Sequence, residues 1–236
     1  MSARVTARVQ SAIAEYGAGN VVLLALHRLL ERLPFPAGVE RLHIVAQPVP
    51  AVPAPPARRG RDIAVRPLGA GDPALAVITR LPGELADRFA QGARCLGAFR
   101  GHELLGWLWF VTVEYRDFTH PVDFELHPQA TTAWDFDVYV RPDARLTAAF
   151  ARLWEVACDE LRARGVRQSL SAISAYNPAS LRAHRRLGMR PFGSLLVVQF
   201  GPLRAVLSRH FHPRIAWSLR AGFRTRLRVE APPPTE

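Results

Sequence analysis

The chain has 236 residues, of which 49% are apolar and 22% are charged. This composition suits one main domain with shorter flanking segments and excludes two large domains. The longest apolar run without charges, residues 104–113, is too short to cross a bilayer as a helix. The start of the chain lacks the apolar core of a signal peptide, which predicts that the protein is not secreted.

Only two cysteines are present, Cys95 and Cys158, and neither belongs to a metal-ligand motif. This argues against a disulfide scaffold and against a zinc site, so no metal is expected. Reduced thiols indicate a cytoplasmic protein.

The formal net charge of +11 is unevenly distributed, and all 31 basic residues are arginine. Residues 1–61 carry +5, residues 62–200 carry +1 and residues 201–236 carry +5. We therefore expect contacts with an anionic partner at the two flanks, around a nearly neutral middle.

The first segment, 1–61, is predicted to be an appendage. Asn20 is placed to cap an amphipathic helix, Val21–Leu33, which is followed by a short strand, Leu42–Ala46. A proline-rich stretch from Gln47 to Gly60 ends the segment and is interpreted as a linker or as an extended arm on the surface. The apolar stripe of the helix is interpreted as packing on the main domain or on a second subunit of a homodimer, with docking on a membrane surface as the alternative.

The second segment, 62–200, is predicted to be a mixed α/β domain, with a central mixed β-sheet flanked by helices. Strands precede helices, and the two then alternate strictly. The expected strands are 63–68, 95–99, 104–113, 133–140, 168–173 and 194–200, and the expected helices are 74–91, 147–164 and 178–187.

The most informative stretch begins with the strand Trp134–Val140. Strand alternation predicts that Asp135, Asp137 and Tyr139 share one face. A tight basic turn and a helix N-terminus follow, an arrangement that binds anions because unpaired N–H groups and the helix dipole converge there.

This stretch and a second block, Asn177–Met189, resemble the GNAT acetyltransferase superfamily. Their order and spacing match the family's two signatures, and the resemblance covers roughly residues 62–200. The first signature matches at Val140, Pro142, Arg145, Leu153 and Arg164-Gly-Val166, and the second at Asn177, Ser180, Leu187, Gly188 and Met189.

The resemblance implies acetyl-CoA as acyl donor and an amine as acceptor, either a small molecule or a protein amine, that attacks the thioester directly. The pyrophosphate would then lie on the loop from Arg145 to Phe150, and the pantetheine would lie along the strand Asp137–Val140. The residues implied in donor binding are Val138, Val140, Arg145, Leu146, Thr147, Ala148, Ala149, Phe150 and Asn177.

The attacking amine must be neutral, so a carboxylate should accept its proton. Asp137 and Asp135 are the first candidates, and Glu114 is the next. The alternative is that Asp135 and Asp137 lie on a solvated strand face and only form ion pairs with arginines. His184 stands where the family has a tyrosine, and an imidazole can protonate the leaving thiolate. Asn177 also suits a helix cap.

The positions where the family prefers glycine hold Leu146, Ala148 and Phe150, so the backbone approaches a phosphate less closely. This keeps open an alternative function, a non-catalytic GNAT-fold binding or scaffold protein anchored by its basic flanks.

The third segment, 201–236, interleaves arginines with aromatic and aliphatic residues. The stretch Leu203–Arg228 suits an anionic membrane surface at the inner face of the membrane, or an acidic partner, and suits nucleic acid less well. A terminal helix that packs and exposes its arginines is the alternative.

Overall fold

The computed structural model describes residues 10–53, 60–78, 83–145 and 147–233. It divides into two compact units, each described here by itself. Unit 1 comprises Met1–Gln47, Asp117–Phe124 and Ala172–Val229, and unit 2 comprises Pro48–Arg116, Glu125–Ser171 and Glu230–Glu236.

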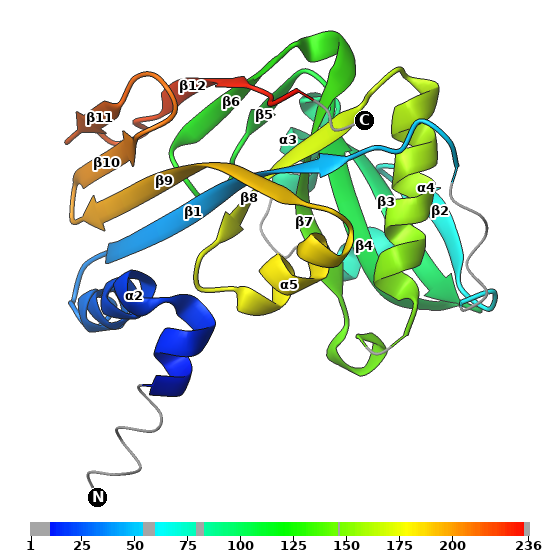
Figure 1. Cartoon of the computed structure of the whole chain (residues 1–236), viewed down its shortest axis with the longest axis horizontal. Helices are drawn as coiled ribbons and strands as arrows, with labels where there is room; N and C mark the ends of the chain where they lie inside the picture. The colour runs from blue at the N-terminus through cyan, green and yellow to red at the C-terminus, as the bar shows by residue number, and fades with distance from the viewer. Residues whose placement is uncertain (1–9, 54–59, 79–82, 146, 234–236) are drawn as a thin grey trace, which may run out of the picture. The chain divides into compact units, whose positions relative to one another are not determined.

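Unit 2 contains a mixed sheet in the order β8-β7-β4-β3-β2 (Figure 1). Strand β7 pairs with β8 in parallel, and the other neighbours pair antiparallel. The strands are β2 (Ala64–Leu68), β3 (Arg94–Arg100), β4 (Glu103–Val111), β7 (Thr132–Val140) and β8 (Gln168–Ser174), of which residues 168–171 belong to this unit. The mixed α/β class predicted from the sequence is thus confirmed.

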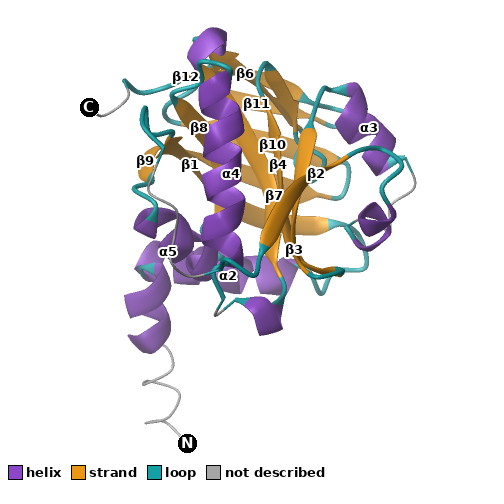
Figure 2. Cartoon of the chain, turned by 90° about the vertical axis from the view of Figure 1, so that its right-hand side faces the viewer, coloured by secondary structure: helices purple, strands orange, loops and turns teal. Residues whose placement is uncertain are grey.

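Helix α4 (Ala149–Ala163) packs against β2, β3, β4 and β7 of the same unit, as Figure 2 shows. Its apolar residues recur at the helical period, and Leu153, Trp154 and Leu161 are each at most 3% exposed. Burying these side chains on the sheet holds the N-terminus of the helix at the end of β7, where the functional stretch lies.

The helix expected at 74–91 is wrong as a single element. The structure has a 3₁₀ turn, η1 (Pro73–Val77), capped by Asp72, and a separate helix, α3 (Glu84–Ala90). Gly83 precedes α3 with φ of 81°, a left-handed conformation that favours glycine and cannot continue a helix. Short strands β5 (Glu114–Arg116) and β6 (Val122–His127) follow β4, and the 3₁₀ turns η2 (Gln129–Thr131) and η3 (Pro142–Ala144) flank β7.

Unit 1 contains an antiparallel sheet in the order β11-β10-β9-β1. Its strands are β1 (Ala37–Pro48), β9 (Arg190–Phe200), β10 (Leu203–Ser208) and β11 (Ile215–Ser218), and β12 (Thr225–Glu230) follows. The strand expected at Leu42–Ala46 is therefore longer. The C-terminal segment forms strands, so the terminal helix considered as an alternative is wrong.

Among the described residues, unit 1 contains α2 (Ala18–Leu30) and α5 (Pro178–Arg186), and residues 10–16 are helical as well. Helix α2 begins three residues earlier than expected, because its N-cap is Gly17 and not Asn20. Asn20 lies inside the helix, where its side chain bonds Tyr16 and Arg41. No residue of α2 is fully buried, and the apolar stripe expected to pack is only partly covered: Leu23 and Leu30 are half-buried, whereas Val22 is 67% exposed.

Within the described residues, no helix combines the length and the apolar character that crossing a bilayer would require.

Candidate functional site

The site in unit 2 begins where β7 loses its neighbour on one side. Strand β7 pairs with β8 only over Thr132–Trp134, whereas it stays paired with β4 as far as Val140. Among the described residues, the stretch Asp135–Val140 therefore has no strand partner on the β8 side. Its main-chain N–H and C=O groups on that side have no strand to pair with. From Asp137 to Val140 the chain is exposed or half-buried, so a ligand that binds as a strand does can pair with these groups there.

A bulge interrupts this stretch at Asp137. Trp109 of β4 lies opposite Phe136 and Trp107 lies opposite Tyr139, so β7 has one residue more than β4 between these pairs. Asp137 adopts φ of 47°, which is unusual for a residue with a side chain. The bulge moves Tyr139 to the same face as Phe136, so the predicted face of Asp135, Asp137 and Tyr139 is wrong.

Asp137 is held by an arginine on its own side of the sheet. The Arg88 guanidinium donates from Nη1 to Asp137 Oδ2 at 2.5 Å and from Nη2 to Glu84 Oε1 at 2.7 Å. It also lies over the rings of Trp109 and Phe136, at 5.0 and 5.4 Å from their centroids. Burial raises the pKa of Asp137, and the charge of Arg88 opposes the shift. The Asp137 side chain keeps 30% of its surface exposed, so this carboxylate is fixed and still accessible.

Asp135 precedes Phe136 and so points to the opposite face. It is only 2% exposed, and Ser169 Oγ donates to its Oδ1 at 2.6 Å. Burial raises the pKa of Asp135 to about 7, and the hydroxyls of Ser169 and Ser171 oppose the shift. The two predicted carboxylates thus have different environments: one is ion-paired and accessible, and the other is enclosed.

The loop after β7 leads to the N-terminus of α4, as predicted. Arg145 is exposed, and its Nε donates to the carbonyl of Val140 at 3.3 Å, which places the guanidinium at the end of β7. Helix α4 starts two residues later than expected, with Ala148 as N-cap. Thr147 Oγ1 accepts from the amide of Ala149 at 3.2 Å, so this first-turn N–H already has a partner.

The other predicted donor-binding residues lie around this loop. Val138 and Ala148 are half-buried, Ala149 is buried, and Phe150 is half-buried as the second residue of α4. Leu146 lies outside the described residues. The half-buried Ala148 is in close contact with Gly60, where an added Cβ would lie 2.6 Å from the Ala148 Cβ.

The second predicted block forms α5 of unit 1. Asn177 is its N-cap, and its Oδ1 accepts from the amide of Ser180 at 3.0 Å. His184 is buried at 2% exposure, which lowers its pKa to about 4. The imidazole is therefore neutral at pH 7, so a charged His184 is not the form available to protonate a thiolate.

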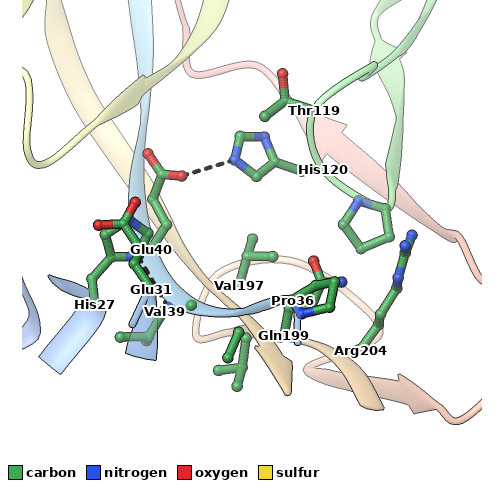
Figure 3. Close-up of a pocket in the computed structure, with 14 residues that line it drawn as sticks. His27, Glu31, Pro36, Val39, Glu40, Thr119, His120, Val197, Gln199 and Arg204 are labelled. Atoms are coloured by element: carbon green, nitrogen blue, oxygen red, sulfur yellow. Dashed lines mark hydrogen bonds and ion pairs between the residues drawn. The ribbon is translucent and has the colours of Figure 1, made fainter. Parts of the chain in front are cut away.

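The sequence reasoning missed a cavity in unit 1, of about 310 Å³, that is lined by both polar and apolar side chains and is shown in Figure 3. His120 is its central group, because Nδ1 lies 3.1 Å from Asp117 Oδ2 and Nε2 lies 3.1 Å from Glu40 Oε2. The two carboxylates outweigh the effect of burial and raise the pKa of His120 to about 9. His27 and Arg204 line other parts of the wall. No short motif marks this site, because His120 and Glu40 lie 80 positions apart in the sequence.

Within the described residues, no group of three or more histidine, cysteine or acidic side chains is arranged to hold a metal ion.

The geometry can be compared with known proteins. A model of the acetyltransferase (GNAT) family matches residues 63–189. A search of curated proteins gave no match. Several solved structures resemble the chain, each at no more than 21% identity among those described below.

One is the GCN5-related glucosamine N-acetyltransferase region of a fungal multi-domain β-N-acetylglucosaminidase, with a TM-score of 0.50, 11% identity and coverage of 75% of this chain and 22% of the other. A second is a GNAT-family acetyltransferase described as putative, from Novosphingobium aromaticivorans, with a TM-score of 0.47, 20% identity and coverage of 68% and 63%. A third is YncA of Salmonella typhimurium with acetyl-CoA, with a TM-score of 0.42, 21% identity and coverage of 60% and 88%.

The chain also covers 55% of the length of a structurally similar Drosophila protein. The family model, by contrast, spans more than half of this chain and includes both signature blocks. The chain therefore belongs to the GNAT acetyltransferase family.

Proposed function

We propose that the protein transfers an acetyl group from acetyl-CoA to the nitrogen of an amine acceptor. The observation that carries this proposal is the bulged, one-sided stretch of β7, Asp135–Val140, which leads directly to Arg145 and the N-terminus of α4. Family membership supports acyl transfer, and YncA, one of the similar structures, was solved with acetyl-CoA.

The residues present fit this donor in most respects. The open main chain of β7 can pair with the amide groups of pantetheine, and Arg145 can bind a phosphate oxygen. The first turn of α4 contributes its dipole, although the amide of Ala149 is already bonded to Thr147. We therefore expect binding that depends on Arg145 more than on a glycine-lined cradle.

In the proposed reaction, the amine nitrogen attacks the thioester carbonyl, the C–N bond forms and the C–S bond breaks. A main-chain N–H of the open β7 stretch stabilises the developing charge on the carbonyl oxygen. Asp137 accepts the proton of the amine, directly or through water, because its carboxylate is exposed while Arg88 fixes its position. The CoA thiolate is then protonated from solvent, since His184 is neutral at pH 7.

Asp135 is the second candidate for the base. A pKa of about 7 suits proton transfer at neutral pH, but the side chain is enclosed. We assign it to a positioning role within β7, where it holds the strand through Ser169.

The test is acetyl-CoA binding followed by turnover. Acetyl-CoA should raise the melting temperature of the protein, because a ligand that binds only the folded state stabilises it. Arg145→Ala should reduce this shift, and Arg167→Ala, which removes an exposed arginine elsewhere in unit 2, should not. Release of free CoA thiol would then be followed with a panel of amino sugars, amino acids and peptide amines.

A binding shift without thiol release from any amine would favour a non-catalytic binding or scaffold protein. No shift at millimolar acetyl-CoA would refute the proposal.

A further inference from the structure

One face of the sheet in unit 1 is apolar at β9, β10 and β11 and becomes exposed at β11. The strand register places Leu196, Leu207 and Ile215 in one row across β9, β10 and β11, and Val198, Ala205 and Trp217 in the next. The exposed fraction rises toward the edge strand, to 64% for Ile215 and 63% for Trp217.

The rows continue to both sides of the strands. Phe200 lies opposite Leu203 and is 47% exposed, and Leu219, which follows β11, is 59% exposed. Single exposed apolar residues are ordinary on a protein surface, but several in adjacent rows mark an interaction site. These exposed residues, Phe200, Ile215, Trp217 and Leu219, are called the open face below.

The stretch of chain that carries Ile215, Trp217 and Leu219 has charges of one sign only. The stretch Leu203–Arg228 contains seven arginines and no acidic residue. Arg214 directly precedes β11, Arg220 directly follows Leu219, and Arg209 lies in the connection between β10 and β11. All three are exposed, and the described part of the chain offers none of them an ion pair of 4.0 Å or less.

We propose that the open face docks on an anionic lipid bilayer. Its aromatic and aliphatic side chains suit the headgroup boundary, while Arg209, Arg214 and Arg220 bind lipid phosphates. A second copy of this chain fits less well, because a two-fold contact would bring the two arginine groups together without acidic partners. The sequence analysis predicted membrane contact for the whole stretch Leu203–Arg228. The proposal made here limits the contact to the open face and to Arg209, Arg214 and Arg220.

The test is co-sedimentation of the full chain with phosphatidylcholine vesicles that contain 30% phosphatidylglycerol, compared with phosphatidylcholine alone. We expect binding to the anionic vesicles only, and release in 0.5 M salt. Trp217→Ser should weaken binding at least tenfold, since a tryptophan is among the strongest interfacial anchors. Val113→Ser, at a residue of unit 2 that is 56% exposed, is the matched control and should bind as the unmodified chain does.

The arginines are tested by the triple variant Arg209→Gln, Arg214→Gln and Arg220→Gln. Each arginine near an anionic surface contributes about fivefold to binding, so the triple variant should bind about a hundredfold more weakly. The control is Arg116→Gln, Arg167→Gln and Arg186→Gln, which removes the same charge from exposed positions elsewhere. Circular dichroism and the melting temperature show that each variant is folded.

Three results would overturn the proposal. The first is no binding to anionic vesicles at low salt, and the second is equal loss in the arginine variant and its control. The third is a stable dimer, measured by sedimentation velocity, that Trp217→Ser dissociates. None of these measurements depends on acetyl transfer, so the proposed function stands or falls separately.

Discussion

Replacing Asp135 with asparagine measures how strongly β7 encloses this carboxyl. Asp135 is 2% exposed, and burial raises its pKa to about 7 from the ordinary 3.8. Between these two values the folded protein holds a proton that the unfolded chain has released. The free energy of unfolding of the unmodified protein therefore falls as the pH rises through this window.

The size of the effect follows from the two pKa values. At a pH where Asp135 is ionised only in the unfolded chain, the free energy of unfolding falls by about 1.4 kcal/mol per pH unit. From pH 5 to pH 8, the Asp135 term should remove about 2.5 kcal/mol of stability. Asparagine does not titrate, and its amide oxygen can still accept from Ser169. The stability of Asp135→Asn relative to the unmodified chain should thus increase by about the same 2.5 kcal/mol over this range.

The assay is urea unfolding at pH 5, 6, 7 and 8 and constant ionic strength, followed by tryptophan fluorescence. Asp143→Asn is the control, because Arg141 lowers the pKa of the exposed Asp143, which is therefore ionised in both states above pH 5. Parallel stability curves for Asp135→Asn and the unmodified protein would refute the reasoning, because they would mean that the carboxyl titrates alike in the folded and unfolded chains.

Three further predictions follow from the described contacts. Asp137→Asn should lower turnover by about 10²- to 10⁴-fold while the acetyl-CoA melting shift is retained; full activity in a thiol-release assay would remove Asp137 as the base. His120→Gln should destabilise the chain below pH 6.5 by up to about 3 kcal/mol and progressively less as the pH approaches 9, because the pKa of His120 is raised to about 9; a loss independent of pH would contradict the ion pairs with Asp117 and Glu40. Gly60→Ala should lower the free energy of chemical unfolding by about 1–3 kcal/mol, because the new Cβ would clash with Ala148 and the φ of 81° disfavours a side chain. The double variant Gly60→Ala, Ala148→Gly should recover only the part of this loss that the clash causes. Full stability of the single variant would refute the contact.

Elements with a regular period and clear ends could be predicted from the sequence. Helix α4 was within two residues of its expected start, because its apolar residues repeat at the helical period and pack on one face. The prediction of one helix at 74–91 was wrong because it gave more weight to the periodic apolar residues than to the local sequence Pro82-Gly83. That sequence disfavours a continuous helix. Helix α2 has the predicted amphipathic pattern, but its N-cap is Gly17 and not the predicted Asn20, so the helix starts earlier.

The candidate site was predicted in its location but not in its geometry. Side chains alternate between the two faces of β7 only where the strand has no bulge. The sequence of Trp134–Val140 contains no signal that predicts the extra residue at Asp137. Arg88 could not be linked to Asp137 because the two lie 49 positions apart and meet only through the packing of α3. The difference between the enclosed Asp135 and the accessible Asp137 is likewise a property of the folded sheet.

The pairing of β1 with β9 has a consequence for how the chain is made. Ala37 lies opposite Phe200, so β1 can pair with β9 only after the residues up to Phe200 have left the ribosome. Contacts so distant in sequence form slowly, and the apolar residues of β1 that they bury stay exposed until they form. For the same reason, a fragment cut to the family-matched residues 63–189 would lack both β1 and β9. It would also lack Val45, so Leu181 of α5 and Met189, which pack with Val45 in the core, would become exposed to solvent.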